Sequence, residues 1–451
     1  MFFFDRESCE LFVDDFMAAP DAERPSRLWD VCQVAVRENA PAYPIIVGHV
    51  FRDRRLFDWA EYIFQLALPI PGARFSAMYE LAFVEQHRAR PQGAVDWLAK
   101  LEAEQPLEAI HQRMFAHQLG HLGRIAEATE RLEKALLLDP GSMETCVSIR
   151  QYIDYYNEYP RDEALRRSEA LTRVYRTKST AEVYEEIMDA LRNRRPYSMV
   201  RVNDGEGGFI HLSVDDEARY AALYRVNRVN WHHIIFGDDK LLYDRDFIAV
   251  TREFTDRLRE ADCIGAHHYW SLQSEYAWGS TRNVPCIFNI VRKLELMHER
   301  GEVDPGAVTL CNPQINQHLL FDGYLEPSIK SQTRIGLISA HPGLQSALKE
   351  RFDLSEVIYH RTPGEAMVHS GLEKEPIASW HGRISHELKQ VEPGMLYLVC
   401  AGLFSKLYCQ MIKDAGGIGL DIGAGGDIWV RAPTRGHHAL PEVRAHGLIE
   451  T

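Results

Sequence analysis

Two carboxylates separated by one glycine follow a short apolar stretch in "YSMVRVNDGEGGFIHL", residues 197–212. The stretch alternates as a strand does, and Asp204 and Glu206 come where that strand should end. If the backbone stays extended, residues two apart point to the same side, so both carboxylates would face one spot. Gly205 would let the backbone turn between them. Two close carboxylates repel each other unless a cation lies between them.

This spacing predicts a site for a divalent metal ion that also holds a phosphate group. Mg²⁺ or Mn²⁺ takes one or two protein carboxylates, and phosphate oxygens of the substrate complete the shell. Arg201 precedes the carboxylates and offers a planar donor to the same phosphates. The backbone N–H groups of Gly207 and Gly208 are open to an anion. The alternative is an acidic turn that caps a helix beginning near Gly208.

The elements that would position this site alternate between strand and helix. A helical pattern at 179–195 opens with Ser179 and Glu182 at the spacing of a capping box. The apolar runs predicted as strands are 197–202, 262–267, 307–312, 334–340, 356–361, 395–402 and 417–423. Helical patterns separate most of these runs, which predicts a mostly parallel, Rossmann-like sheet.

Unusual polar residues recur where the predicted strands end. The segments are "SAHPG" (339–343), "HRTPGE" (360–365), "AGLFSK" (401–406) and "DIGAGGDIW" (421–429). Ligands of such sheets bind at the carboxyl ends of the strands. A purely structural sheet needs glycine and proline turns there, but not repeated His, Arg, Lys and Asp. Together these segments predict one polar pocket.

The first third of the chain is an internal repeat with a period of 34 residues. Two columns of small residues lie 12 positions apart, which is typical of two helices that touch through small side chains. The four columns are Gly48, Ala82 and Ala116; Ala60, Ala94 and Ala128; Phe64, Leu98 and Leu132; and Ala67, Leu101 and Ala135. The unit "AHQLGHLGRIAEATERLEKALLLDP" (116–140) resembles the tetratricopeptide repeat. Such units stack into a curved solenoid.

The domain organisation follows from these patterns. We expect an N-terminal helical region at 1–40, three repeats at 41–142, capping or linker helices at 143–177, and an α/β domain at 178–451. The repeats either pack only on the α/β domain or offer a concave surface to a protein or peptide. The fold class is therefore a TPR-like helical solenoid followed by a Rossmann-like α/β domain.

Composition narrows the class of protein. Apolar and charged fractions of 45% and 26% are those of a globular protein. The net charge of −14 argues against a nucleic-acid partner, because phosphate neutralisation needs a basic face. No apolar run of about 18 residues predicts a membrane span. Eight scattered cysteines without a CxxC pair suit a reducing compartment. We expect a cytoplasmic protein, with membrane association through partners as an open alternative.

Two segments carry a resemblance to a known family. "VRVNDGEGG" (200–208) resembles the Arg-x-Gly-Asp-Gly-Glu signature of GT-D-type glycosyltransferases. "AGLFSKLYCQMIKDAGGIGLDIGAGGDIW" (401–429) resembles the C-terminal block of that superfamily. The resemblance covers roughly 180–435 and departs at Asn203, where the family usually has glycine. It implies a GT-D-type domain in which Asp204 and Glu206 bind Mn²⁺ or Mg²⁺ and the diphosphate of a nucleotide sugar.

The remaining site assignments follow from this reading. The metal would neutralise charge on the leaving diphosphate, assisted by Arg201 and by a helix start at 402–405. Either Glu275 or Glu365 would act as the general base. The predicted donor-binding residues are Arg201, Asn203, Gly205, His341, Arg361, Gly402, Ser405, Lys406, Asp421, Gly423 and Asp427. For Lys406 a solvated helix position is the alternative, and for Asp421 a turn-forming role.

We therefore expect a metal-dependent glycosyltransferase. Its donor would be a nucleoside-diphosphate sugar, with a UDP-sugar as the first choice. Its acceptor would be a protein or glycan recruited by the TPR-like repeats. Two alternatives stay open at this point: a metal-dependent hydrolase of a nucleotide or sugar phosphate, and a non-catalytic TPR scaffold.

Overall fold

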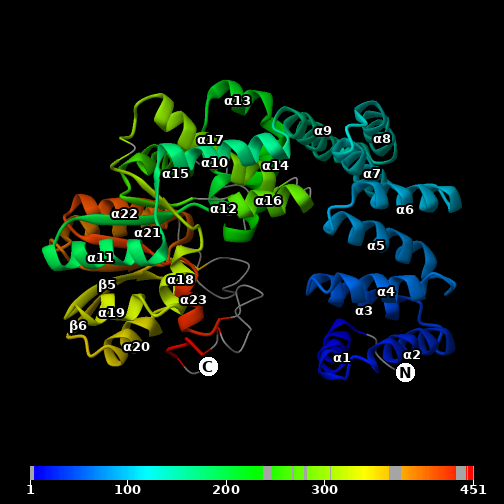
Figure 1. Cartoon of the computed structure of the whole chain (residues 1–451), viewed down its shortest axis with the longest axis horizontal. Coiled ribbons are helices and arrows are strands. Elements are labelled where there is room, and N and C mark those ends of the chain that lie inside the picture. The colour runs from blue at the N-terminus through cyan, green and yellow to red at the C-terminus, as the bar shows by residue number, and fades with distance from the viewer. Residues whose placement is uncertain are drawn as a thin grey trace. The chain divides into compact units, whose positions relative to one another are not determined.

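The computed structural model describes the chain except for residues 1–4, 237–244, 267–268, 279–281, 305, 365–376, 433–442, 444 and 450–451. Only the backbone is described for residues 204, 232–236 and 277–278. The chain forms two compact units, shown in Figure 1. The first contains residues 1–159 and 274–281, and the second contains residues 160–273 and 282–451.

The first unit is built from consecutive helices. They are α1 (Arg6–Ala18), α2 (Arg24–Arg37), α3 (Ala42–Asp53), α4 (Phe57–Ala67), α5 (Arg74–His87), α6 (Pro91–Glu104), α7 (Ala109–His121), α8 (Ile125–Leu138) and α9 (Met143–Glu158). From α3 to α8 each helix packs on the next, so the row of helices in Figure 1 follows the order of the chain. Each of the three predicted repeats is one pair of helices, α3 with α4, α5 with α6 and α7 with α8.

The columns of small residues lie where the helices of a pair touch. Ala82 and Ala94 are fully buried in the second pair, as are Ala116 and Ala128 in the third. In the first pair, a β-carbon added to Gly48 would lie 2.2 Å from the Phe64 ring. Small side chains therefore set the close approach of the paired helices, as the 12-residue spacing predicts.

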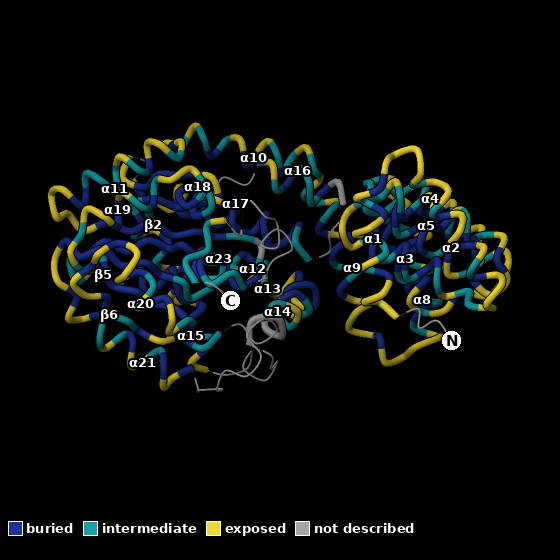
Figure 2. Tube along the Cα trace, turned by 90° about the horizontal axis from the view of Figure 1, so that it is seen from below, coloured by how far each residue is buried: buried dark blue, intermediate teal, exposed yellow. Residues whose placement is uncertain are grey.

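The second unit contains one sheet of eight parallel strands, in the order β1-β4-β3-β2-β8-β7-β5-β6. The strands are β1 (Arg176–Thr177), β2 (Tyr197–Arg201), β3 (Cys263–Gly265), β4 (Thr309–Cys311), β5 (Arg334–Ser339), β6 (Glu356–Arg361), β7 (Leu396–Val399) and β8 (Ile418–Asp421). All seven predicted strands are present. The strands β2, β7 and β8 are buried along their whole length, as the dark blue of the sheet in Figure 2 shows.

Helices cover both faces of this sheet. They include α10 (Arg161–Val174), α11 (Thr180–Asn193), α15 (Arg245–Arg257), α17 (Asn283–Glu299), α18 (Ile315–Phe321), α19 (Leu325–Lys330), α20 (Gly343–Arg351), α21 (Ile377–Glu387) and α22 (Ser405–Asp414). Shorter or irregular connections hold α12 (Asp204–Gly207), α13 (Val214–Arg219), α14 (Ala221–Phe236), α16 (Tyr269–Trp278) and α23 (Gly425–Trp429). No helix in the described part of the chain is both long and apolar enough to span a membrane.

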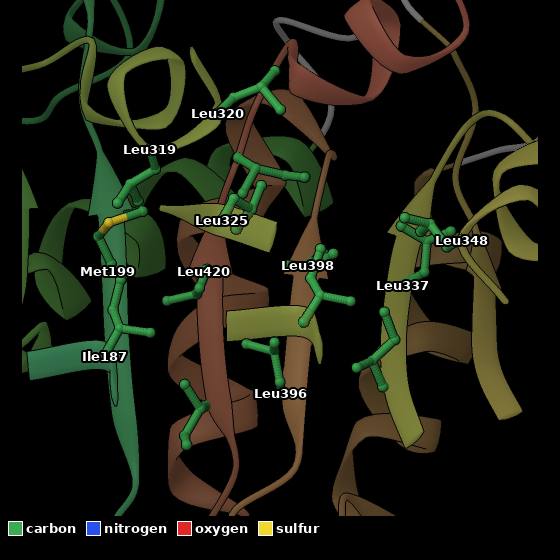
Figure 3. Packing of buried hydrophobic residues seen from close by; sticks show 14 of the residues in the cluster. Ile187, Met199, Leu319, Leu320, Leu325, Leu337, Leu348, Leu396, Leu398 and Leu420 are labelled. Carbon is green, nitrogen blue, oxygen red and sulfur yellow. The ribbon is translucent and has the colours of Figure 1, made fainter. Parts of the chain in front are cut away.

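One core cluster packs helices onto the strands. Ile187 of α11, Leu319 of α18 and Leu348 of α20 lie in the same cluster as strand residues such as Met199 and Leu398 (Figure 3). On the other side, α22 packs on β2, β7 and β8 and also contacts α15. The chain passes from β5 to β6 at the edge of the sheet, whereas it passes from β7 to β8 in the opposite direction, toward β2. The strand order therefore reverses between β5 and β7, the kind of position where ligands bind.

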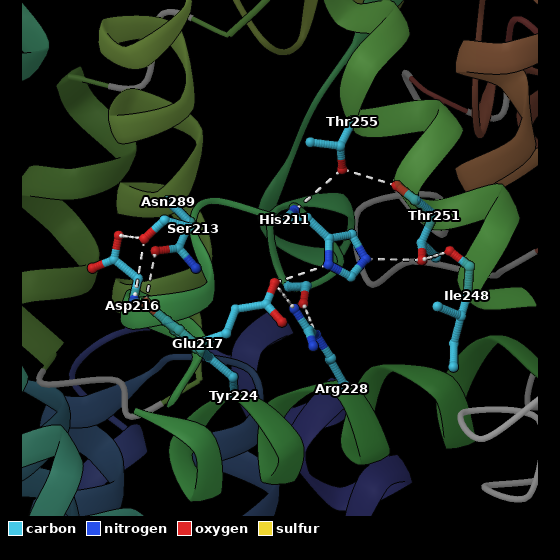
Figure 4. A network of polar contacts seen from close by, with 11 residues as sticks. His211, Ser213, Asp216, Glu217, Tyr224, Arg228, Ile248, Thr251, Thr255 and Asn289 are labelled. Atoms are coloured by element: carbon cyan, nitrogen blue, oxygen red, sulfur yellow. Dashed lines mark hydrogen bonds and ion pairs between the residues drawn. The ribbon is translucent and has the colours of Figure 1, made fainter. Parts of the chain in front are cut away.

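A polar network fixes the helical segment between β2 and β3. His211 Nδ1 lies 2.8 Å from Glu217 Oε1, and His211 Nε2 lies 3.1 Å from Thr251 Oγ1 (Figure 4). Arg228 Nη2 donates to the same Glu217 oxygen at 3.3 Å. Burial would raise the pKa of Glu217, but the His211 hydrogen bond and the Arg228 charge lower it to about 2. The network ties α13, α14 and α15 together and is structural.

Candidate functional site

Arg201 is the last residue of β2 and joins the ends of three strands. Its Nε donates to the carbonyl oxygen of Pro313, after β4, at 2.9 Å. Its backbone N–H donates to Asp421 Oδ2, at the end of β8, at 3.2 Å. A β-carbon on Gly423 would lie 2.1 Å from Arg201 Nη1, so the guanidinium lies directly against this glycine. The predicted residues Arg201, Asp421 and Gly423 therefore meet at one point of the sheet edge.

Lys406 lies at the centre of the same edge. Its Nζ is 2.5 Å from Glu206 Oε1, 3.0 Å from Asp421 Oδ2 and 3.0 Å from the carbonyl oxygen of Gly402. The side chain is 3% exposed, so the alternative of a solvated helix position is wrong. Burial would lower the pKa of Lys406, but the charges of Asp421 and Glu206 raise it above its usual value. Lys406 is therefore a buried ammonium held by two carboxylates.

The backbone around Glu206 differs from the expected extended strand end. β2 stops at Arg201, and Asp204–Gly207 forms the short helical turn α12. Residues two apart do not face each other on a helix, so the pairing of carboxylates by strand alternation does not apply. Glu206 Oε2 accepts from the backbone N–H of Asn203 at 3.1 Å, which caps this turn. The capping alternative for the acidic turn thus describes Glu206, although the capped helix begins at Asp204.

Asp421 is fully buried and accepts hydrogen bonds at both oxygens. Its Oδ1 accepts from the Gly423 N–H at 3.1 Å, and its Oδ2 from Arg201 and Lys406. We call Arg201, Glu206, Lys406 and Asp421 the polar centre. Its two cationic and two anionic side chains balance each other, which makes burial of all four tolerable.

Both carboxylate oxygens of Glu206 already accept hydrogen bonds within the second unit, and its metal role stays a prediction. Lys406 takes one oxygen of Glu206 and the Asn203 N–H takes the other. Burial would raise the pKa of Glu206, but the Lys406 charge and hydrogen bond lower it to about 2 without any metal. Among the described side chains, no group of three or more His, Cys, Asp or Glu is arranged to hold a metal. The Asp204 side chain lies outside the described part, so its metal role stays a prediction.

A second pair of polar residues lies where the strand order reverses. His341, just after β5, has its Nε2 2.8 Å from Asp427 Oδ1, in the first turn of α23. Both side chains are mostly buried, at 17% and 13% exposed. The backbone N–H of His341 donates to Ser339 Oγ at 3.1 Å. The fold thus brings together two predicted donor-binding residues that lie 86 positions apart in the chain.

Gly402 lies in the turn before α22 and has open space where a side chain would begin. Gly402 adopts a left-handed φ of +53°, and a β-carbon there would have no atom within 4 Å. Ser405 is fully buried, and its Oγ accepts from the Ala401 N–H at 2.9 Å, so it holds the turn. Gly205 lies in α12, where a β-carbon would be 3.5 Å from the Trp231 ring. Of these predicted residues, Gly402 borders open space.

Three predicted residues are not placed with the polar centre. Arg361 is exposed at the end of the edge strand β6, which β5 and β7 separate from β8. Glu275 belongs to the first unit and lies close to Tyr152. Burial raises the pKa of Tyr152, and the negative charge of Glu275 raises it further. Glu365 lies outside the described residues. The general base therefore stays a prediction.

Asn316, in α18, lies at this edge of the sheet and was not among the predicted site residues. This side chain is 2% exposed, and its Nδ2 donates to the carbonyl oxygen of Ile422 at 3.0 Å. Its Oδ1 has no hydrogen-bond partner among the described residues. Asn316 follows the apolar run 307–312, but its position beside β8 depends on a strand order that spacing does not reveal.

Comparisons with known proteins add no family. No protein-family model matches this chain, and no curated protein matches it. The polar centre, the His341–Asp427 pair and the open turn at Gly402 are therefore the features from which a function can be inferred.

Proposed function

We propose that this chain is a glycosyltransferase that uses a nucleoside-diphosphate sugar, with a UDP-sugar as the first choice. The observation that carries the proposal is the polar centre at the carboxyl ends of β2, β7 and β8. Its residues come from the two segments that resemble GT-D-type glycosyltransferases. In a Rossmann-like sheet this edge is where a nucleotide binds.

The donor diphosphate would lie against the turn that begins α22. The positive end of the α22 dipole favours an anion there, and no atom lies within 4 Å of a β-carbon on Gly402, which lets phosphate approach this turn. All three N–H groups of Lys406 already have acceptors, so Lys406 would act through its charge rather than by direct contact. The fixed cations Lys406 and Arg201 would stabilise charge that grows on the leaving diphosphate.

His341 would contact the donor or the acceptor hydroxyl near the same edge. The Asp427 carboxylate holds one ring nitrogen at 2.8 Å and so sets the orientation of the imidazole. An imidazole oriented by a carboxylate is suited to binding a hydroxyl and to moving its proton. Asp427 would then be a positioning residue.

The helical unit would recruit the acceptor. Its helix pairs follow the 34-residue period, and we interpret them as a TPR-like solenoid. Such solenoids present extended surfaces to protein segments, which favours a protein acceptor or a protein-bound glycan. The second unit would supply donor binding and transfer.

Calorimetric titration with a panel of nucleoside-diphosphate sugars tests this proposal. We compare wild type with Arg201→Lys, which keeps the charge but loses the planar donor fork. The matched control is Arg257→Lys, because Arg257 ends α15 and pairs with Glu260 at 2.7 Å and with Asp414 at the far end of α22 from Lys406. We expect one donor to bind wild type and the control, and to bind Arg201→Lys at least tenfold more weakly.

A folded wild-type protein that binds none of the donors would contradict the proposal. Transfer and hydrolysis separate in a second assay, which measures free sugar with and without a candidate acceptor. Sugar release that no acceptor changes would instead favour a hydrolase. Donor binding that Arg201→Lys leaves unchanged would move the site away from the polar centre.

A further inference from the structure

Three oxygens from three strand ends surround one buried point. Glu206 Oε1 follows β2, Asp421 Oδ2 ends β8 and the Gly402 carbonyl oxygen follows β7. Lys406 Nζ fills this point, between 2.5 and 3.0 Å from each oxygen. An ammonium has three N–H donors, so this oxygen cradle satisfies all of them.

The oxygen cradle has the ligand chemistry of a divalent cation. Mg²⁺ and Mn²⁺ prefer carboxylate and carbonyl oxygens, and both kinds are present. A lysine at the start of a helix is also electrostatically unfavourable, because the helix dipole is positive there. Lys406 is the second residue of α22, so the two carboxylates must outweigh that cost. The Lys406 ammonium is thus a buried cation at the point where the resemblance to GT-D-type glycosyltransferases implies a metal ion.

We propose that Lys406 Nζ is the resident cation of this site and takes the place of a divalent metal. The metal-free oxygen cradle stands on its own geometry, whereas its importance for donor binding rests on the proposed function. Because the ammonium is covalently tethered, it is present in every molecule and no chelator removes it. Donor binding therefore needs no added metal.

Removing the lysine should expose the oxygen cradle. In Lys406→Ala the Glu206 and Asp421 carboxylates lose their shared cation, and the space of the lysine side chain becomes free for a hydrated ion. Arg201 then remains as the one cation of the polar centre beside two buried carboxylates, so a divalent ion that enters should stabilise the variant. The matched control is Lys413→Ala, on the same helix, because Lys413 contacts a single carboxylate, Asp262, at 2.9 Å and is 25% exposed.

The first measurement is a Mn²⁺ titration monitored by electron paramagnetic resonance. The spectrum of free Mn²⁺ loses intensity when the ion binds to the protein. We expect no Mn²⁺ site at the oxygen cradle of wild type or of Lys413→Ala. We expect one Mn²⁺ to bind Lys406→Ala and to raise its unfolding temperature, with both effects absent in Lys406→Ala/Glu206→Gln. A folded Lys406→Ala that binds no Mn²⁺ would overturn the inference.

If Lys406→Ala does not fold, Mn²⁺ binding by the wild-type protein tests the inference instead. One Mn²⁺ bound by wild type and lost in Glu206→Gln would overturn the inference, and its absence supports it. Donor titrations of wild type with chelator and with Mn²⁺ give an independent result. Equal affinity supports a resident lysine, whereas binding only with Mn²⁺ overturns the inference and leaves the proposed function intact. No donor binding in either condition refutes the proposed function, and the Mn²⁺ titration still judges the oxygen cradle.

Discussion

The guanidinium of Arg201 lies where Gly423 would carry a side chain. A β-carbon built on Gly423 would be 2.1 Å from Arg201 Nη1, far inside contact distance. Gly423 also has a φ of +47°, which residues with a side chain seldom adopt. Gly423 is therefore required for two reasons: its backbone has a positive φ, and Arg201 occupies the space of a side chain.

Gly423→Ala should displace Arg201. We expect a loss of about 3 kcal/mol in the free energy of unfolding, from overpacking and left-handed strain together. Gly323→Ala is the matched control, because Gly323 has a φ of +77° and no atom within 4 Å of an added β-carbon. It should lose only about 1 kcal/mol. Urea unfolding measures both variants, and equal losses would show that Arg201 does not depend on the glycine.

His341 and Asp427 should act as one unit. We expect His341→Asn and Asp427→Asn each to lower kcat/KM for the donor about tenfold, and the double variant to be little worse than either. The control pair is His318 and Asp322, an exposed pair at the C-terminal end of α18, with the two groups 3.8 Å apart. Steady-state kinetics with the donor found by titration gives the coupling. Effects that multiply in the double variant would mean independent roles.

Acid should selectively remove the contribution of Glu217. The folded state lowers the pKa of this carboxyl to about 2 from 4.5, so its contribution is complete above about pH 4.5 and is lost as the pH falls toward 2. With 31% of the side chain exposed, we expect Glu217→Gln to cost about 2 kcal/mol at pH 7. The difference from wild type should shrink below pH 4, measured by urea unfolding. Glu299→Gln, at an exposed position of α17, is the control for the loss of a surface carboxylate.

Two glycines of the helical unit should respond oppositely to alanine. Gly48→Ala drives a β-carbon into the Phe64 ring between α3 and α4, which we expect to cost about 1–3 kcal/mol. Gly93→Ala meets only the flexible carboxylate of Glu85, which can move aside. The gain in helix propensity should then keep stability unchanged or raise it. Thermal unfolding compares the two, and a neutral Gly48→Ala would remove the packing argument for the 12-residue spacing.

Much of the fold was predictable because its signals are local. The seven predicted strands are apolar runs, and Ser179 with Glu182 forms the capping box that their spacing indicates. β1 was missed because Arg176 and Thr177 are both exposed, so no apolar pattern marks them. The three repeat pairs were predictable because their small residues keep a fixed period.

The residues of the polar centre were predictable from the sequence, but their contacts with one another were not. Arg201, Glu206, Lys406 and Asp421 were all selected from strand ends, yet their mutual contacts depend on β2 and β8 being neighbours. The pairing of Glu206 with Lys406, 200 positions away, was not predicted, because it has no local signal. Asn316 was missed for the same reason. Spacing identifies the residues of a parallel-sheet site, and only the strand order says which of them touch.

The chain enters the helical unit twice. Residues 274–281 belong to it although they lie more than 110 positions beyond Tyr159. Tyr276 from this segment donates to the Tyr159 carbonyl oxygen at 2.8 Å, and its ring lies 5.5 Å from that of Tyr156. A cut after residue 159 would remove this last piece of the helical unit. The helical unit is therefore discontinuous in the sequence, and its last segment follows the strands β2 and β3 of the other unit along the chain.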